Sequence, residues 1–434
     1  MNEQDKIPVS KVGRTATFMK AGVKVGGNYL KYYTNKALRK ETSKEKLNEA
    51  NAEDIMNSLS KLKGSVLKAA QMLSMDTGLL PKAYADKFQT AQYSVPPLSY
   101  PLITRTFRKY FKKNPTDLFD SFTPKAVRAA SIGQVHKAML NGNELAVKIQ
   151  YPGVADSVRN DLKVAKPLAA KLINIKMEDL EYYMEEVEEK LVQETDYGLE
   201  LKRSMSLSNA CKHIPHVVFP QYLPEYSSDK IITMEWMDGL HLKEWLDSSP
   251  TQAEKNKMGQ ALWNFYSYQV HVLRVSHADP HPGNFIITPE GRLAVIDFGC
   301  VKEIPEAFYD SFFQLVEGDV LNDDKALMEI YQSLNMIRPD DTEEEVAMFS
   351  RLYKEMIELL GRPLRHDRFD FSDDSFFNQL NEITERVMRD KNIRKSNAAR
   401  GSRDSIYLNR IYIGLYAILH DIGAEVKTGI VNKV

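Results

Sequence analysis

Residues 276–285, with the sequence SHADPHPGNF, gather several side chains that can bind metals or act on phosphates in one short loop. His277 and His281 flank Asp279, and Asn284 follows that aspartate by five residues. The two prolines of the loop exclude a regular helix. Two kinds of chemistry fit: a metal site built on the histidines and the aspartate, or a phosphoryl-transfer loop built on the aspartate and the asparagine.

The segment after this loop favours phosphoryl transfer. The sequences FIIT and RLAVI, on either side of a Pro289-Glu290-Gly291 turn, predict two short antiparallel strands. Asn284 enters the first strand and Asp297 leaves the second, so the hairpin should place them side by side. Asp297 also begins the tripeptide Asp-Phe-Gly. In the protein-kinase catalytic centre, which has this order of motifs, the loop aspartate orients or deprotonates the nucleophile, and the asparagine and second aspartate hold Mg²⁺.

A site of this kind needs a lysine on a strand and a loop that approaches the phosphates. Residues 134–140 and 144–151 predict two strands joined by a tight Asn141-Gly142 turn, and the second strand carries Lys148 in an Ala-Val-Lys sequence. That lysine would place a positive charge on the phosphates. The loop before these strands should be glycine-rich but is mostly alanine, and therefore stiffer. The loop residues expected near the phosphates are Ala129, Ala130, Ser131 and Gly133.

Further polar side chains lie on predicted helices. The carboxylate that pairs with a kinase lysine comes from a neighbouring helix, and the sequence VQETDYGLE offers Glu194, Asp196 and Glu200 without choosing among them. A helix is also predicted over residues 52–75, where Gly64, Lys68 and Gln71 share one face. The amine of Lys68 and the amide of Gln71 beside Gly64 suggest that this face makes a polar contact at close range. The alternative is that these side chains are simply solvated on the helix surface.

The composition limits the class of protein, the compartment and the partners that can be expected. The chain has 434 residues, of which 43% are hydrophobic, enough for a sizeable core, and its net charge of −1 gives no argument for nucleic-acid binding. Two cysteines, Cys211 and Cys300, exclude a disulfide framework and favour a reducing, cytoplasmic compartment. No apolar stretch is long enough to predict a transmembrane helix. Residues 1–40 carry nine basic and two acidic residues, which could attach the chain peripherally to an anionic membrane; a mobile, solvated extension is the alternative.

From about residue 50 to the C-terminus, these motifs resemble in content and order the UbiB/AarF family of atypical kinases, within the protein-kinase-like superfamily. Lys68-Ala69-Ala70-Gln71 resembles the family's K-x-G-Q motif, RAASIGQVHKA its A-A-A-S loop, and ETDY with the later Glu200 its E-x-D motif and lysine partner. The resemblance implies two ion pairs, Lys148–Glu200 and Lys68–Glu194. The chain departs from the pattern at Ala70 and at Arg128, which leaves the fine nucleotide preference open.

The resemblance implies an α+β, bilobal protein-kinase-like fold with a small β-sheet N-lobe and a helical C-lobe. The expected domains are a basic segment (1–50), a helical extension with the K-x-G-Q-like motif (51–115), the N-lobe (116–236) and the C-lobe (237–434). Asp279, Lys148 and Glu200 would be catalytic, and Asn284 and Asp297 would bind the metal. The remaining nucleotide contacts would come from the alanine-rich loop and from Lys68, Gln71, Glu194, Asp196, Glu235 and Met237.

ATP and Mg²⁺ are the implied cofactors, and the implied role is kinase or ATPase activity in support of ubiquinone-type, isoprenoid-quinone biosynthesis. A quinone-precursor lipid or quinone-biosynthesis proteins would then be partners. Ordinary protein kinase activity is not expected, because after Asp297-Phe298-Gly299 the chain passes Ile304-Pro305-Glu306 and goes straight into a predicted helix, which leaves almost no room for an activation segment. The alternatives are a small-molecule kinase of the aminoglycoside/choline phosphotransferase type, a non-catalytic nucleotide-binding scaffold, and a metallohydrolase.

Overall fold

The structure, a computed structural model, describes residues 11–38, 43–62, 69, 87, 97–129, 132–173, 177–317, 319–390, 392–393, 396 and 400–429. The chain divides into two compact units. The first comprises Met1–Leu201 and Gln221–Trp236, and the second comprises Lys202–Pro220 and Met237–Val434. The chain therefore leaves the first unit within helix α8 (Tyr197–Cys211) and returns to it for one strand. The expected division into four domains stays a prediction.

A five-stranded antiparallel sheet forms the centre of the first unit, with the strand order β1-β3-β4-β6 and with β2 also paired to β3. Its strands are β1 (Ser121–Phe122), β2 (Arg128–Ala129), β3 (Gly133–Leu140), β4 (Asn143–Gln150) and β6 (Ile231–Glu235). Asn141 and Gly142, between β3 and β4, have φ angles of +51° and +81°. Positive φ angles at both central residues are those of a type I′ hairpin turn, so the predicted turn is confirmed.

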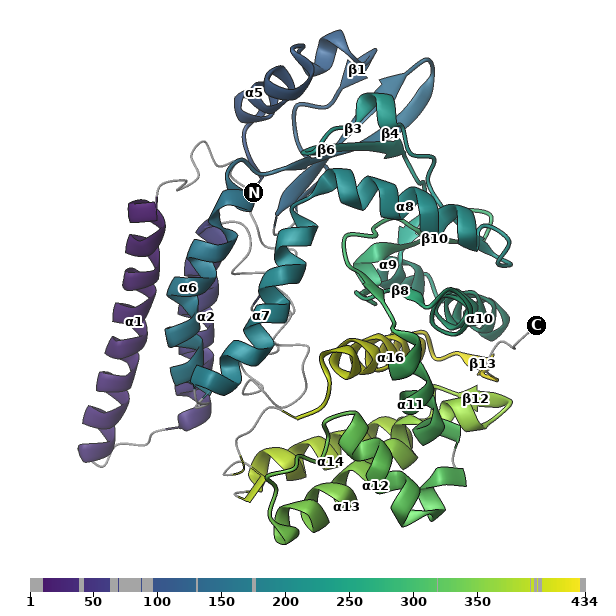
Figure 1. Ribbon diagram of the computed structural model, residues 1–434. Coiled ribbons are helices and arrows are strands. Elements are labelled where there is room, and N and C mark those ends of the chain that lie inside the picture. Colours follow the sequence, from purple (N-terminus) through teal and green to yellow (C-terminus); the bar gives the residue numbers. More distant parts are fainter. Residues whose placement is uncertain are drawn as a thin grey trace. The chain divides into compact units, whose positions relative to one another are not determined.

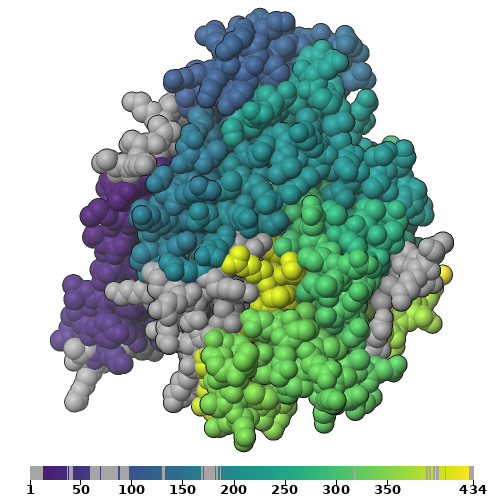
Figure 2. Space-filling model, in the orientation of Figure 1, coloured from purple at the N-terminus to yellow at the C-terminus, as the bar shows by residue number. Residues whose placement is uncertain are grey.

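Helix α5 (Tyr100–Phe111) covers the sheet. Its buried residues Ile103 and Phe107 belong to the same apolar cluster as Phe119 and Phe122 of the sheet region. Phe107 meets each of those rings edge-on, an arrangement that aromatic quadrupoles favour. The other face of α5 is exposed, and Figure 2 shows this segment (blue) at the surface.

Four longer helices of the first unit pack against one another: α1 (Lys11–Ala37), α2 (Lys44–Leu62), α6 (Val154–Ile173) and α7 (Met177–Glu194) (Figure 1). Arg14 of α1 forms a two-bond ion pair with Asp161 of α6, and these side chains are only 6% and 2% exposed. A buried, paired charge fixes the position of α1 on α6. The alternative of a mobile, solvated extension is therefore wrong for residues 11–37.

Gly133, the first residue of β3, has no room for a side chain. A Cβ there would lie 2.8 Å from the backbone oxygen of Ile149 and 2.6 Å from the hydroxyl of Tyr197. We expect Gly133→Ala to lower the free energy of unfolding by about 1–3 kcal/mol, since the sheet backbone has to move. Chemical denaturation measures this. Gly26→Ala in α1, where a Cβ meets nothing within 4 Å, should not destabilise; equal stability of both variants and the native chain would contradict the prediction.

The second unit is largely helical and has one large apolar core. Its helices are α9 (Leu242–Asp247), α10 (Gln252–Tyr268), α11 (Glu306–Glu317), α12 (Asp324–Ser333), α13 (Glu343–Leu360), α14 (Asp374–Arg389) and α16 (Arg403–Ile422). Helix α10 begins at a capping box formed by Thr251 and Glu254. The sequence TQAEKNKMGQALWNFYSYQVHVLRV (251–275) predicts one long helix, whereas a π-helical turn at Gln269–Leu273 follows α10 and strand β8 begins at Val275. None of the described helices is both long and apolar enough to cross a membrane.

Three small sheets complete the second unit. One has the order β5-β10-β9-β7, the second pairs β11 with β8, and the third pairs β12 with β13. Their strands are β5 (Val217–Val218), β7 (Leu240–His241), β8 (Val275–His277), β9 (Phe285–Ile287), β10 (Leu293–Val295), β11 (Val301–Glu303), β12 (Arg368–Asp370) and β13 (Glu425–Lys427). Beyond residue 305 the sequence predicts helices with breaks near 338–342 and 362–373; β12 lies in the second break, whereas β13 departs from that expectation. The left-handed Gly423 (φ +66°) ends α16 and lets the chain turn into β13.

The π-helical turn places His271 in the core of the second unit. Its Nδ1 lies 2.7 Å from the Tyr309 hydroxyl and its Nε2 lies 3.0 Å from that of Tyr412. Burial, with a smaller contribution from the Arg274 charge, lowers the pKa of His271 to about 3 from its ordinary 6.5. The folded protein therefore keeps this imidazole neutral.

This buried histidine predicts a pH dependence of stability. The pKa of His271 is about 6.5 in the unfolded chain and about 3 in the folded one, so between these pH values only the unfolded chain binds a proton on this side chain. The contribution of neutral His271 to the free energy of unfolding is therefore fully present above pH 6.5. Below that pH the free energy of unfolding falls by up to about 1.4 kcal/mol per pH unit. Denaturation between pH 7 and pH 4.5 should show a shallower loss for His271→Gln than for His213→Gln, a change at an exposed histidine. Identical slopes would contradict the prediction.

Candidate functional site

Lys148 and Glu200 form a buried ion pair in the first unit. Lys148 lies in β4, opposite Val135 of β3 and Ile232 of β6. Its Nζ donates to Glu200 Oε1 at 2.6 Å, and the side chains are 14% and 5% exposed. The same ammonium lies 5.2 Å from the ring centroid of Tyr197, one turn before Glu200 in α8. The pair inferred from the family resemblance is thus present, and its function stays a prediction.

The junction of α7 and α8 carries the other two acidic candidates, Glu194 and Asp196. The Thr195 carbonyl accepts hydrogen bonds from the side chains of Gln150 (2.9 Å) and Lys230 (2.7 Å), which ties the junction to the sheet. Glu194, the last residue of α7, is buried. Asp196 is exposed, and its carboxylate accepts from the Leu199 N–H at 2.9 Å, so it caps α8. Asp196 therefore has a structural role besides the proposed one.

The structure describes only some of the other site residues predicted from the sequence before Asp279. Ala129 is half-buried in β2 opposite Gln134. Glu235 ends β6 and is exposed; its carboxylate accepts from the Gln221 N–H at 3.1 Å. Met237 is the first residue of the second of the two segments that form the second unit. Four predicted residues, Lys68, Gln71, Ala130 and Ser131, lie outside the described residues, and so does the expected Lys68–Glu194 pair.

The loop of the second unit that carries Asp279 is held from two sides. Arg410 of α16 donates through Nη2 to Asp279 Oδ1 at 2.7 Å, and both side chains are 11% exposed. Asn284 donates through Nδ2 to the Asp279 carbonyl at 2.9 Å. The two ends of the loop are thereby closed on each other, and the amide nitrogen of Asn284 is used in this contact.

The predicted hairpin brings Asp297 beside this loop. Strands β9 and β10 pair with Phe285 opposite Val295, and the Ile296 N–H donates to the Asn284 carbonyl at 3.1 Å. Asp297 Oδ1 accepts from the Gly299 N–H at 2.7 Å, which forms a tight turn over the buried Phe298. The hairpin prediction is confirmed. An amide oxygen and a carboxylate on adjacent chain ends are the ligand types that Mg²⁺ takes from proteins, so these two residues fit a magnesium ion.

Within the part of the chain that the structure describes, the loop histidines are not grouped into a metal site. His277 is fully buried, and its Nδ1 lies 2.9 Å from the Tyr266 hydroxyl. His281 accepts a hydrogen bond through Nδ1 from the Gly283 N–H at 3.0 Å. Among the described residues no three His, Cys, Asp or Glu side chains are grouped so that they could hold a metal ion. The structure therefore gives the metallohydrolase alternative no support, and His277 is a structural histidine.

Arg410 is the site residue that sequence reasoning missed. It is the only charged residue between Asp404 and His420, within the apolar sequence of α16. A charge in a buried helix face has to be paired, so its isolation was a usable signal, although its partner lies 131 residues away. Helix α16 also touches the loop directly, because a Cβ at Gly414 would lie 2.4 Å from Cγ of Pro280.

Breaking this pair should be costly. Arg410→Met leaves the Asp279 carboxylate buried without its cation, and we expect about 3 kcal/mol less stability in chemical denaturation. The double variant Arg410→Met/Asp279→Asn should recover a good part of that loss, because the uncompensated charge is gone. Arg338→Met, which breaks a pair with the 70% exposed Asp340, is the matched control and should cost at most about 1 kcal/mol. Equal costs for Arg410→Met and Arg338→Met would refute this assignment.

Comparison with known proteins decides the family. Residues 90–331, more than half of the chain, match the ABC1 atypical kinase-like domain. The chain belongs to the UbiB family of atypical kinases. The family lies within the protein-kinase-like superfamily, so the resemblance inferred from the motifs and the α+β, kinase-like fold are both confirmed.

Two curated relatives and one solved structure are each about a quarter identical in sequence to this chain. "Atypical kinase COQ8B, mitochondrial" from Danio rerio is 26% identical over 89% of the chain, and "Probable serine/threonine-protein kinase abkA" from Dictyostelium discoideum is 26% identical over 78% of it. The chain spans 63% and 64% of those two proteins, respectively. The solved complex of Rv3197 with erythromycin from Mycobacterium tuberculosis is 26% identical, with a TM-score of 0.60 over 88% of this chain and 95% of that one.

Proposed function

We propose that this UbiB-family chain binds Mg-ATP, and that it hydrolyses ATP or transfers its γ-phosphoryl group in support of ubiquinone-type, isoprenoid-quinone biosynthesis. The observation that carries the proposal is the β9–β10 hairpin. It joins the Asp279–Asn284 loop to the Asp297 turn, with the hydrogen bonds that orient Asn284 and Asp297. Kinase-like phosphoryl transfer uses these residue types in this order.

Each residue then has a defined task. Asn284 and Asp297 would hold Mg²⁺, which, when bound, neutralises charge on the phosphate oxygens. Lys148 would place its ammonium on the phosphates, and Glu200 fixes that ammonium in position through the 2.6 Å contact. Asp279 would orient or deprotonate the attacking hydroxyl or water, and Arg410 holds its carboxylate on one side.

The connection after Asp-Phe-Gly argues against transfer to proteins, whatever the name of the Dictyostelium discoideum relative suggests. Strand β11 begins two residues after Gly299 and pairs with β8, and α11 begins at Glu306. Most of the short segment between Gly299 and α11 is therefore paired with β8. Too few residues remain to form the activation loop against which protein kinases bind a peptide substrate. A small molecule or water remains as acceptor.

Acceptor class can be tested directly. The full chain is incubated with Mg-ATP and a mixed peptide library, while ADP release and phosphate transfer to peptide are measured together. We expect ADP release without comparable peptide labelling. Peptide labelling that matches ADP release would overturn the exclusion of protein substrates, and Asp279→Asn serves as the catalytically impaired control.

Contact with a membrane is part of the proposal, and it is supported by the exposed face of α1. Met19, Val23 and Leu30 are 67%, 76% and 70% exposed, and Lys20 and Lys31 are exposed on the same helix. Exposed apolar side chains interleaved with lysines are typical of helices that lie on anionic lipid surfaces. A quinone-precursor lipid would be met at such a surface.

A further inference from the structure

Strands β8 and β11 connect the Asp279 loop with the Asp297 turn. The loop follows β8 in the chain, and the turn precedes β11. The two strands are paired, and the Ala278 N–H extends the ladder toward both catalytic segments by donating to the Cys300 carbonyl at 2.9 Å. A displacement of β11 would therefore move the Asp297 turn relative to the Asp279 loop.

Lys302, the central residue of β11, attaches this strand to helix α16. Its Nζ lies 2.7 Å from Asp404 Oδ1, and the two side chains are 17% and 26% exposed. The same ammonium lies 5.0 Å from the ring centroid of Tyr407, one turn further along α16. A partly buried ion pair is screened less by salt and water than one at the surface, and a cation over an aromatic ring adds to the attraction. These contacts fix the strand that follows Asp-Phe-Gly.

The same helix also holds the loop that follows β8. Arg410, two turns after Asp404, donates to Asp279 Oδ1 at 2.7 Å. Closer to the end of α16, a Cβ at Gly414 would lie 2.4 Å from Cγ of Pro280, so helix and loop are in direct contact. Both catalytic segments of the second unit are thus attached to one helix, which keeps their separation constant.

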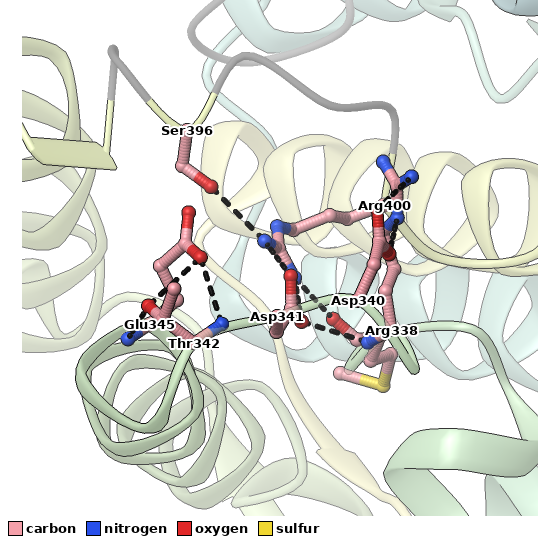
Figure 3. A network of polar contacts seen from close by, with 8 residues as sticks. Arg338, Asp340, Asp341, Thr342, Glu345, Ser396 and Arg400 are labelled. Carbon is pink, nitrogen blue, oxygen red and sulfur yellow. Dashed lines mark hydrogen bonds and ion pairs between the residues drawn. The ribbon is translucent and has the colours of Figure 1, made fainter.

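The start of α16 is itself held in place. Arg400, just before the helix, donates through its two terminal nitrogens to the Asp341 carboxylate at 2.6 Å each, and to Ser396 at 3.0 Å (Figure 3). The side chains of Arg400 and Asp341 are 9% and 5% exposed. A two-bond arginine–carboxylate pair defines geometry as well as contributing energy. The first turn of α16, which carries Asp404, therefore has a defined position within the second unit.

We propose that Lys302 is a positioning residue for the magnesium site. By pairing with Asp404 it fixes β11, and thereby the turn that presents the Asp297 carboxylate to the metal. The inference rests on the proposed function, in which Asp297 binds Mg²⁺. Lys302 acts through the strand, so its loss leaves the metal ligands in the chain but holds them less firmly. Ligands whose orientation is fixed by surrounding contacts bind a metal more tightly than loosely held ones.

Lys302→Met tests the proposal, because methionine keeps most of the side chain's length and removes the ammonium. We expect calorimetry to show Mg-ATP binding about three- to thirtyfold weaker than in the native chain, the range typical of residues that act through a packed network. In the metal-free chain, hydrogen exchange should become faster in residues 296–303 and stay unchanged in α13. Unchanged Mg-ATP affinity, with faster exchange throughout the second unit, would mean a merely structural role and overturn the proposal.

Matched variants locate the effect. Lys302→Arg keeps a cation for Asp404 and should restore Mg-ATP affinity to within about threefold of native. Lys302→Met/Asp404→Asn should bind no more weakly than Lys302→Met, because both changes break one contact; additive losses would exclude Asp404 as the partner. Arg368→Met breaks the Arg368–Glu425 pair between β12 and β13, whose side chains are 61% and 45% exposed. It should bind Mg-ATP like the native chain.

Two further outcomes are separable. Should Lys302→Met fail to fold, Asp404→Asn breaks the same contact from the more exposed side, and native affinity in that variant would contradict the proposal. A native chain that bound no Mg-ATP would refute the proposed function. The exchange measurement on the metal-free chain does not depend on nucleotide, and unchanged exchange in residues 296–303 would by itself show that Lys302 does not position the Asp297 turn.

Discussion

Asp297→Asn is expected to abolish measurable Mg-ATP binding while the protein stays folded. Asparagine keeps a side-chain oxygen that can accept from the Gly299 N–H, so the turn that now holds Asp297 at 2.7 Å should persist. The negative charge that would bind the metal is lost. Even outer-shell partners of metal ligands typically contribute about 10- to 100-fold to metal affinity, so removing the ligand's charge should cost more than about 100-fold.

Calorimetric titration with Mg-ATP measures this loss, and thermal unfolding checks the fold. Asp310→Asn is the matched control, because Asp310 is an exposed aspartate of α11 in the same unit. It should bind Mg-ATP like the native chain. Undiminished binding by Asp297→Asn would show that this carboxylate is not the metal ligand.

Lys148→Met should have the second large effect. Methionine fills similar space on β4 but removes the ammonium that Glu200 holds at 2.6 Å. Loss of one preorganised charge or donor at a transferring group typically lowers turnover by about 100- to 1,000-fold. We expect kcat/KM for ATP to fall by that order, while Lys137→Met, in the neighbouring strand and paired with the half-exposed Glu144, should stay within about twofold.

Glu200 adds an internal check on that assignment. If Glu200 acts only by positioning Lys148, the Lys148→Met/Glu200→Gln double variant should be no worse than Lys148→Met alone. Steady-state ADP release gives all three values. Additive losses would mean that Glu200 has a separate role, and a nearly native Lys148→Met would remove the lysine from the phosphate site.

Local patterns predicted the parts of the site that lie close together in the sequence. The Pro289-Glu290-Gly291 turn and the strands around it predicted that Asn284 and Asp297 lie on adjoining chain ends, and the pairing of Phe285 with Val295 agrees with this. The Asn141-Gly142 turn likewise fixed the register that puts Lys148 opposite Val135. In each hairpin a few residues determine the turn and the pairing together.

Long-range contacts could not be predicted in the same way. Nothing near Arg410 points to Asp279, and nothing near Arg14 points to Asp161, because each pairing depends on how distant helices pack. The partner of Lys148 was one of three carboxylates until the family resemblance selected Glu200. Strand β13 was missed because three residues are too few to show a period against the long apolar helix before them.

We propose that this chain is a Mg-ATP-dependent phosphotransferase or ATPase that acts beside a quinone-precursor lipid. The most direct measurement is ADP release by the full chain with Mg-ATP, with and without anionic liposomes and a phenolic quinone-precursor mimic, against Asp297→Asn as background. We predict release that requires Mg²⁺, exceeds this background and increases when liposomes or the phenol are added. Release no greater than that of Asp297→Asn under every condition would contradict the account.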